Sequence, residues 1–106
     1  MEYFPHKWLL VRIDGPEPLY KVFASFIAGG DSWKINSGIT CIEDKGDHLR
    51  IYGHSGSVYA CRKDAYGASQ YGFVVLGELE NMSYKLTRIN TLEEALEATR
   101  HLESYK

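Results

Sequence analysis

The sequence predicts an α+β fold in a single domain, residues 1–106: an antiparallel meander of about five strands with one or two C-terminal helices packed on it. A small curled barrel is the alternative form of the sheet. Two observations predict this class. Strand-like alternation separated by turn residues fills the first sixty residues, and a helical pattern fills the last seventeen. At 44% hydrophobic and 25% charged, a chain of this length has the composition of one globular domain.

Five segments are predicted to be strands because apolar residues alternate in them or run continuously. They are "KWLLVRI" (7–13), "LYKVFASFI" (19–27), "GITCIED" (38–44), "HLRIYG" (48–53) and "SVYACR" (57–62). The first two are apolar on both faces, which predicts a sheet that is covered on both sides. The segment "AGGDSWKINSG" (28–38) is predicted to be a polar loop, and "YKLTRI" (84–89) a further strand.

Two short turns, Lys45–Gly46 and Ser55–Gly56, predict the register of the last three of these strands. Two-residue loops there would set Glu43 opposite His48 and Tyr52 opposite Tyr59. The core face would then consist of Thr40, Ile42, Leu49, Ile51, Val58 and Ala60. The outer, more polar face would consist of Ile39, Cys41, Glu43, His48, Arg50, Tyr52, His54, Tyr59 and Cys61.

The two cysteines are predicted to be free thiols. In this register, Cys41 and Cys61 lie on the first and third strands, roughly 9–10 Å apart, whereas a disulfide needs Cα atoms within about 7 Å. Free thiols are typical of a reducing cytoplasm. Although His48 and His54 share their face, the spacing matches no common zinc motif, so neither a metal nor a cofactor is predicted.

The helical pattern is clearest in "NTLEEALEATRHLESYK" (90–106). Thr91 and Glu94 have the spacing of a capping box, which marks a helix start. The predicted apolar stripe consists of Leu92, Ala95, Leu96, Thr99 and Leu102. The segment "FVVLGELENM" (73–82) fits either a strand or a short helix with Val75, Leu79 and Met82 on one face, and we favour the helix.

The stretch "GHSGS" (53–57) resembles the nucleophile elbow G-x-S-x-G of serine hydrolases, but Ser57 occupies the position of the last glycine. The elbow requires a helix after the serine, whereas strand-forming residues follow here. Ser55 is therefore predicted to lie in a hairpin turn, and the protein is predicted not to be an enzyme.

Aromatic side chains are the remaining candidates for function. The chain has eight tyrosines, four phenylalanines and two tryptophans, and such rings give large contact areas at binding surfaces. Each ring taken alone fits a place in the core, but for the set at least one exposed patch is expected. The predicted binding residues are Trp33, Asn36, Arg50, Tyr52, Tyr59, Tyr66 and Tyr71.

Net charge and hydropathy limit the partners. A net charge of −2 argues against a nucleic-acid partner. No run of eighteen apolar residues occurs, and "MEYFPHKWLLVRIDG" has none of the features of a signal peptide. We therefore expect a cytoplasmic protein without a membrane partner.

Over roughly residues 6–67 the chain resembles a group of small uncharacterised proteins encoded by tailed phages and prophages. The resemblance depends on "DSWKINSGI" (31–39) and "GHSGSVY" (53–59). It implies no particular site residues. It does imply a context, because phage proteins of this size often act by binding and blocking a host protein.

These observations favour a non-enzymatic binding protein, phage-derived and inhibiting a bacterial host or defence factor through protein–protein contact. Two alternatives remain open. One is a small-molecule or nucleotide-binding module, with its pocket between the loop at Trp33 and the sheet face that carries Arg50, Tyr52 and Tyr59. The other is a phage structural or assembly component, for which a homo-oligomer is expected.

Overall fold

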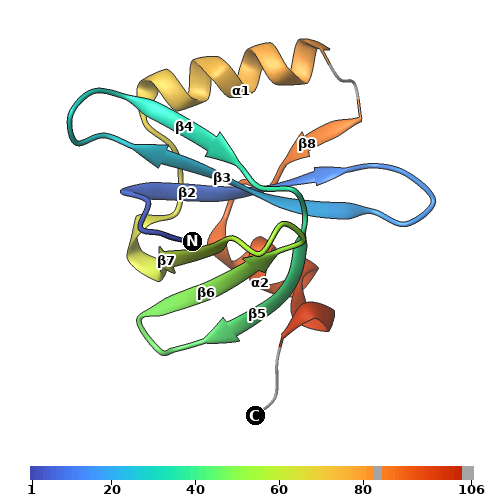
Figure 1. The fold of residues 1–106 in the computed structure, drawn as a ribbon. Helices are drawn as coiled ribbons and strands as arrows, with labels where there is room; N and C mark the ends of the chain where they lie inside the picture. Colours follow the sequence, from blue (N-terminus) through green and yellow to red (C-terminus); the bar gives the residue numbers. More distant parts are fainter. Residues whose placement is uncertain (83–84, 104–106) are drawn as a thin grey trace.

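A computed structural model describes residues 1–82 and 85–103. These residues form two four-stranded sheets and two α-helices, which confirms the predicted α+β class, and neither sheet closes into a barrel (Figure 1). Sheet A has the order β1 (Glu2–Tyr3), β7 (Val58–Arg62), β6 (His48–Gly53), β5 (Ile39–Asp44). Sheet B has the order β4 (Ser32–Ile35), β3 (Leu19–Phe26), β2 (Lys7–Ile13), β8 (Leu86–Arg88). The helices are α1 (Gln70–Met82) and α2 (Leu92–Ala98), and two 3₁₀ turns are η1 (Lys63–Ala65) and η2 (Arg100–Leu102).

The two sheets and α1 form three layers. One buried cluster lies between the sheets, and a second lies between sheet B and α1. Because β2 and β3 contribute alternate residues to the two clusters, both of their faces are apolar, as the sequence predicts. The first cluster contains Trp8, Leu10, Val22, Ala24, Ile42, Leu49, Ile51, Tyr59 and Cys61. The second contains Leu9, Val11, Phe23, Val75 and Leu76.

The strand β4 lies inside the segment that the sequence predicts to be a polar loop, so that prediction is wrong for residues 32–35. Polar and apolar side chains alternate along β4: Ser32 and Lys34 are exposed, whereas Trp33 and Ile35 are half-buried. A strand with one polar, exposed face and one apolar, half-buried face is typical of the edge of a sheet. Surrounding glycines and polar residues hide this pattern in the sequence.

The predicted register of the β6–β7 hairpin is wrong by one residue, because Tyr52 pairs with Val58. The turn is longer than two residues: the Gly53 N–H donates to the Ser57 carbonyl, and the Gly56 N–H donates to the Gly53 carbonyl. Gly56 has φ 88°, the left-handed conformation that adds one residue to this type of hairpin.

A shift of one residue moves every side chain of a strand to the opposite face. Tyr59 and Cys61 therefore lie in the core rather than on the predicted outer face, and Val58 and Ala60 leave the core face. Cys41 stays half-buried outside the cluster between the sheets. Both cysteines are free thiols, as predicted.

The β5–β6 hairpin also differs from its predicted register. Glu43 pairs with Arg50 rather than with His48, because the last pair before the turn is Asp44 with Leu49 and four residues separate them. A bulge between Ile39 and Cys41 then reverses which face of the sheet the first side chains of β5 occupy. As a result Ile39 is buried and Thr40 is exposed, the opposite of the predicted arrangement.

The ambiguous segment 73–82 is helical, as favoured. Val75 and Leu76 face sheet B and Leu79 packs against the same cluster, but Met82 is 82% exposed and does not belong to the predicted apolar face. The predicted strand 84–89 is present as Leu86–Arg88, and its first residue lies outside the described residues.

The predicted N-cap of the last helix is confirmed, since the Thr91 hydroxyl accepts a hydrogen bond from the Glu94 N–H at 3.1 Å. The helix ends at Ala98, well before the predicted end, and η2 follows it. At this end the Thr99 hydroxyl donates to the Ala95 carbonyl at 2.7 Å, and such local bonding disfavours continuation of the helix. Residues 104–106 of the predicted helix lie outside the described residues.

Candidate functional site

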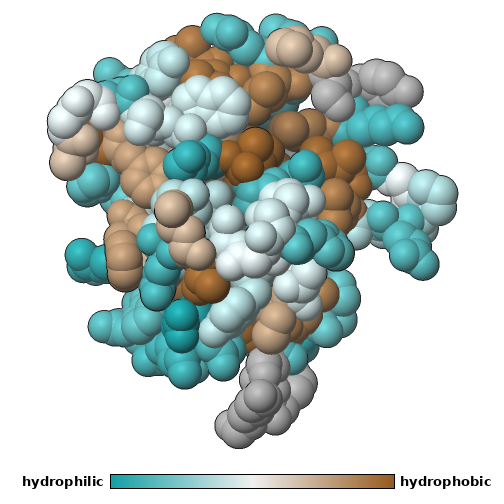
Figure 2. Space-filling model, viewed as in Figure 1, coloured by the Kyte–Doolittle hydropathy of each residue, from teal (hydrophilic) through white to brown (hydrophobic). Residues whose placement is uncertain are grey.

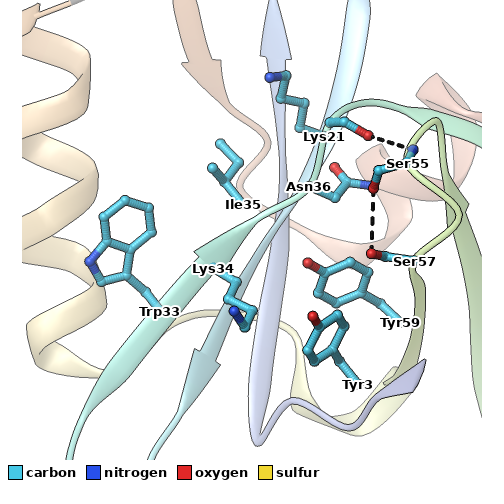
Figure 3. A pocket seen from close by; sticks show the side chains of 10 residues that line it. Tyr3, Lys21, Trp33, Lys34, Ile35, Asn36, Ser55, Ser57 and Tyr59 are labelled. Atoms are coloured by element: carbon cyan, nitrogen blue, oxygen red, sulfur yellow. Dashed lines mark hydrogen bonds between the residues drawn. The ribbon is translucent and has the colours of Figure 1, made fainter. Parts of the chain in front are cut away.

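A groove of about 590 Å³ runs beside β4, between the edge of sheet B and the turn that joins β6 to β7 (Figure 3). We call it the β4 groove. In Figure 3, Lys34 on β4 and Asn36 just after it extend toward Tyr3, Tyr59 and the serines of the β6–β7 turn, whereas Trp33 extends to the other side, toward α1. The groove is lined by Tyr3, Lys21, Trp33, Lys34, Ile35, Asn36, Ser37, Ser55, Ser57 and Tyr59.

The β4 groove is positively charged. Among the described residues, its lining includes two lysines, Lys21 and Lys34, and no carboxylate. Neither lysine has a carboxylate partner within residues 1–82 and 85–103, although the Lys34 ammonium lies 5.2 Å from the centre of the Tyr3 ring. By contrast, every arginine of the chain is in an ion pair: Arg12–Asp14, Arg50–Glu2, Arg62–Asp64, Arg88–Glu80 and Arg100–Glu97.

Asn36 forms the floor of the groove and is 4% exposed. Its side-chain Oδ1 accepts a hydrogen bond from the Val22 N–H at 2.8 Å, and its backbone N–H donates to the Val22 carbonyl at 3.1 Å. The side chain thus replaces a backbone carbonyl where β4 ends. The buried Nδ2 has no hydrogen-bond partner in the described part of the chain, so its partial positive charge adds to that of the lysines.

Serine side chains hold the opposite wall in place. The Ser37 hydroxyl accepts a hydrogen bond from the Ser55 N–H at 3.0 Å, which ties the end of β4 to the β6–β7 turn (Figure 3). The Ser55 and Ser57 hydroxyl oxygens lie 3.4 Å apart. Ser55 lies in the turn, as the sequence predicts, and its hydroxyl group lines the groove.

Two stacked tyrosines form the end of the groove. The Tyr3 and Tyr59 ring centres are 5.0 Å apart, with 29° between the ring planes. Tyr59 is only 3% exposed, and burial raises its pKa above the ordinary value. The two rings cover each other on one side, and Lys34 lies over the Tyr3 ring.

The structure brings together three of the predicted binding residues, Trp33, Asn36 and Tyr59, in the β4 groove. Trp33 also stacks on Phe23, with ring centres 5.6 Å apart. Tyr71 lies at the start of α1 and is 46% exposed, away from the groove.

Arg50 and Tyr52 lie on the outer face of sheet A, where intramolecular contacts hold them. Arg50 pairs with Glu2 at 3.4 Å, and its guanidinium lies 5.5 Å from the centre of the Tyr52 ring. The Tyr52 hydroxyl donates to the Glu43 carboxylate at 2.6 Å, and this hydrogen bond is the largest cause of its raised pKa.

Tyr66 connects β2 to the residue that follows β8 and packs against the core. Its hydroxyl accepts a hydrogen bond from the Leu10 N–H at 3.1 Å and donates one to the Ile89 carbonyl at 2.7 Å. Its ring packs edge-on against Trp8, with ring centres 4.8 Å apart. Burial raises the pKa of Tyr66 to about 12. These contacts give Tyr66 a structural role.

The raised pKa of Tyr66 predicts a loss of stability at alkaline pH. A tyrosine in the unfolded chain ionises near pH 10, so the stabilisation is complete below that pH and is lost as the pH rises through about 12. Urea unfolding at about pH 8 and about pH 11 checks this, since the free-energy difference between the wild type and Tyr66→Phe should shrink at the higher pH. A difference of the same size at both pH values would contradict the prediction.

The sequence does not reveal the remaining groove residues, among them Tyr3, Lys21, Lys34 and Ser57. They come from four separate strands or turns, so only the tertiary fold brings them together. For Lys34, its place between the apolar residues Trp33 and Ile35 is a local signal that could have put it on a strand.

Comparison with known protein families, curated proteins and solved structures finds no match for this chain. In the described part of the chain, no helix is long and apolar enough to cross a membrane.

Proposed function

We propose that this chain is a non-enzymatic binding protein that takes a segment of another protein in the β4 groove. One observation carries the proposal: the groove contains two lysines without carboxylate partners among the described residues, together with hydroxyl and amide groups and no carboxylate. Charged groups arranged in this way attract a partner of opposite charge and orient it.

The resemblance to tailed-phage proteins supports a more specific form of this proposal, in which the protein inhibits a bacterial host or defence factor. Its two free thiols, Cys41 and Cys61, are typical of a protein that works in a reducing compartment such as the cytoplasm. An inhibitor of this kind needs a stable interface, and the ammonium, hydroxyl and amide groups of the groove can contact one.

A second candidate function is the binding of a small anionic molecule, such as a nucleotide, in the same groove. A volume of about 590 Å³ is sufficient for such a ligand, and Lys21 and Lys34 could contact its anionic groups. Thermal-shift measurements with nucleotides test this candidate, because a ligand at 100 times its Kd stabilises the folded state by about 2.7 kcal/mol.

The surface over α1 supports a further possibility, self-association of a phage assembly component. Figure 2 shows hydrophobic side chains gathered over the part of the molecule where α1 lies. Val74 is 60% exposed there, and Tyr71 and Phe73 are also exposed. Light scattering would show the homo-oligomer that this candidate requires.

An affinity experiment tests the leading proposal. The wild-type protein and a Lys21→Glu/Lys34→Glu variant are immobilised and exposed to bacterial lysate. We expect a protein to be retained in stoichiometric amount by the wild type and lost by the variant, because the reversed charges repel the same partner. A Lys7→Glu variant is the matched control, since Lys7 is exposed but does not line the groove. Failure to retain a partner, or equal retention by all three proteins, would contradict the proposal.

A further inference from the structure

Within residues 1–82 and 85–103, the strand β4 pairs with another strand on one side only. It stands at the end of sheet B, and β3 is its neighbour in that sheet. An edge strand presents unpaired N–H and C=O groups that can pair with a strand from another chain. The β4 groove lies along this strand, so the edge opens into the groove rather than into a packed interface.

The hydrogen bonds to β3 show which backbone groups face the groove. The Asn36 N–H points toward β3, because it donates to the Val22 carbonyl at 3.1 Å. In an antiparallel pair, residues that bond the neighbouring strand alternate with residues whose backbone groups point away from it. The backbone N–H and C=O groups of Lys34 therefore point toward β3, as the Asn36 N–H does. Those of Trp33 and Ile35 point away from β3.

The two lysines have a spacing that suits an extended chain. Since Val22 is opposite Asn36, Lys21 is opposite Ser37, three residues along from Lys34. Three residues of a strand span roughly 10 Å. Val22 belongs to the cluster between the sheets, so Lys21 extends to the other face of sheet B from Lys34.

Resting on the proposed function, we infer that the groove binds an extended acidic segment of the partner, which adds to β4 as a fifth strand of sheet B. Strand addition of this kind takes its affinity from backbone hydrogen bonds and its specificity from side-chain contacts. In a strand, residues i and i+3 lie on opposite faces and about 10 Å apart. An acidic side chain opposite Lys34 therefore pairs with it directly, and one at i+3, opposite Ser37, reaches across to Lys21 on β3.

Other occupants fit these observations less well. A small anion neutralises the lysines but leaves the backbone groups of both Trp33 and Ile35 without strand partners. A second copy of this chain, paired edge to edge through β4, would bring its own Lys21 and Lys34 beside the first pair. Like charges so placed repel each other. An acidic strand satisfies the backbone groups and the lysines together.

Synthetic peptides test the inference by fluorescence anisotropy. The probe is a labelled eight-residue peptide of threonine and valine, with glutamates at its third and sixth positions. We expect saturable binding, about tenfold weaker when the glutamates stand at the third and fifth positions, on one face. Methylation of the backbone nitrogens that face β4 is expected to abolish binding, because it removes the donors. The Lys21→Glu/Lys34→Glu variant is expected not to bind this peptide, but to bind a peptide with lysines in place of the two glutamates. The Lys7→Glu variant is expected to bind the glutamate peptide as the wild type does.

Two results would overturn the inference. One is equal binding of the methylated and unmethylated peptides, which excludes strand addition. The other is an absence of peptide binding when the lysate experiment still shows a partner that depends on Lys21 and Lys34. In that second case the proposed function stands and only the acidic-strand inference fails. If the lysate experiment also shows no such partner, both fail.

Discussion

Replacing Tyr66 with phenylalanine is expected to lower the free energy of unfolding by about 2–4 kcal/mol. The substitution removes one hydroxyl and leaves two backbone groups without their partner, the Leu10 N–H and the Ile89 carbonyl. A buried group that loses its hydrogen bond costs about 1–3 kcal/mol. Urea unfolding near neutral pH measures the difference.

Tyr71→Phe is the matched control, because it removes the same atom from a tyrosine that is 46% exposed. A surface substitution of this kind is expected to change stability by less than about 0.5 kcal/mol. Equal effects of the two substitutions would show that Tyr66 has no special structural role. Tyr66 would then return to the set of candidate binding residues.

Gly38→Ala is expected to destabilise the protein by about 2–4 kcal/mol. Gly38 connects the end of β4 to β5 and has φ 137°, a conformation that residues with a Cβ rarely adopt. An added Cβ would also lie 2.8 Å from Leu19 Cδ1 and 2.9 Å from His54 Cδ2. Because the His54 N–H donates to the Gly38 carbonyl, the β6–β7 turn would shift with it.

Gly30→Ala separates backbone strain from crowding. Gly30 also has a positive φ, 113°, but a Cβ there would meet no atom within 4 Å. We therefore expect Gly30→Ala to cost only the strain, about 1–2 kcal/mol. Thermal and urea unfolding of both variants give the comparison. A larger loss for Gly30→Ala than for Gly38→Ala would mean that the close contacts at Gly38 are unimportant.

Periodicity predicts most of the elements of this fold. The alternating segments 7–13 and 48–53 are strands with those bounds, and the spacing of Thr91 and Glu94 marks the start of α2 correctly. These signals are local, since each depends on which residues neighbour one another along a strand or a helix. The α+β class follows from them.

Register and exposure could not be predicted in the same way. The conformation of Gly56 decides which face of β7 is buried, and the sequence "SGS" is compatible with several turn types. Tyr59 and Cys61 therefore appear on the wrong face in the prediction. The division into two sheets depends on long-range contacts, and β1 pairs in parallel with a strand more than fifty residues away.

The candidate site shows the same limit. Aromatic composition points to Trp33 and Tyr59, which line the groove, but it cannot separate them from Tyr66, which is held inside the fold. Nothing in the sequence singles out this pair of lysines among its twelve Lys and Arg residues. Only the fold shows that they line one groove and that, among the described residues, neither has the carboxylate partner that every arginine has.

Hydrogen exchange at the backbone of β4 tests most directly the central claim that this edge is the binding surface. In the free protein, we expect the amides of Trp33 and Ile35 to exchange faster than those of Lys34 and Asn36, which face β3. Adding the glutamate peptide is expected to slow exchange at Trp33 and Ile35. If peptide binds and these two amides keep their rates while other parts of the surface become protected, the β4 edge is not the binding site.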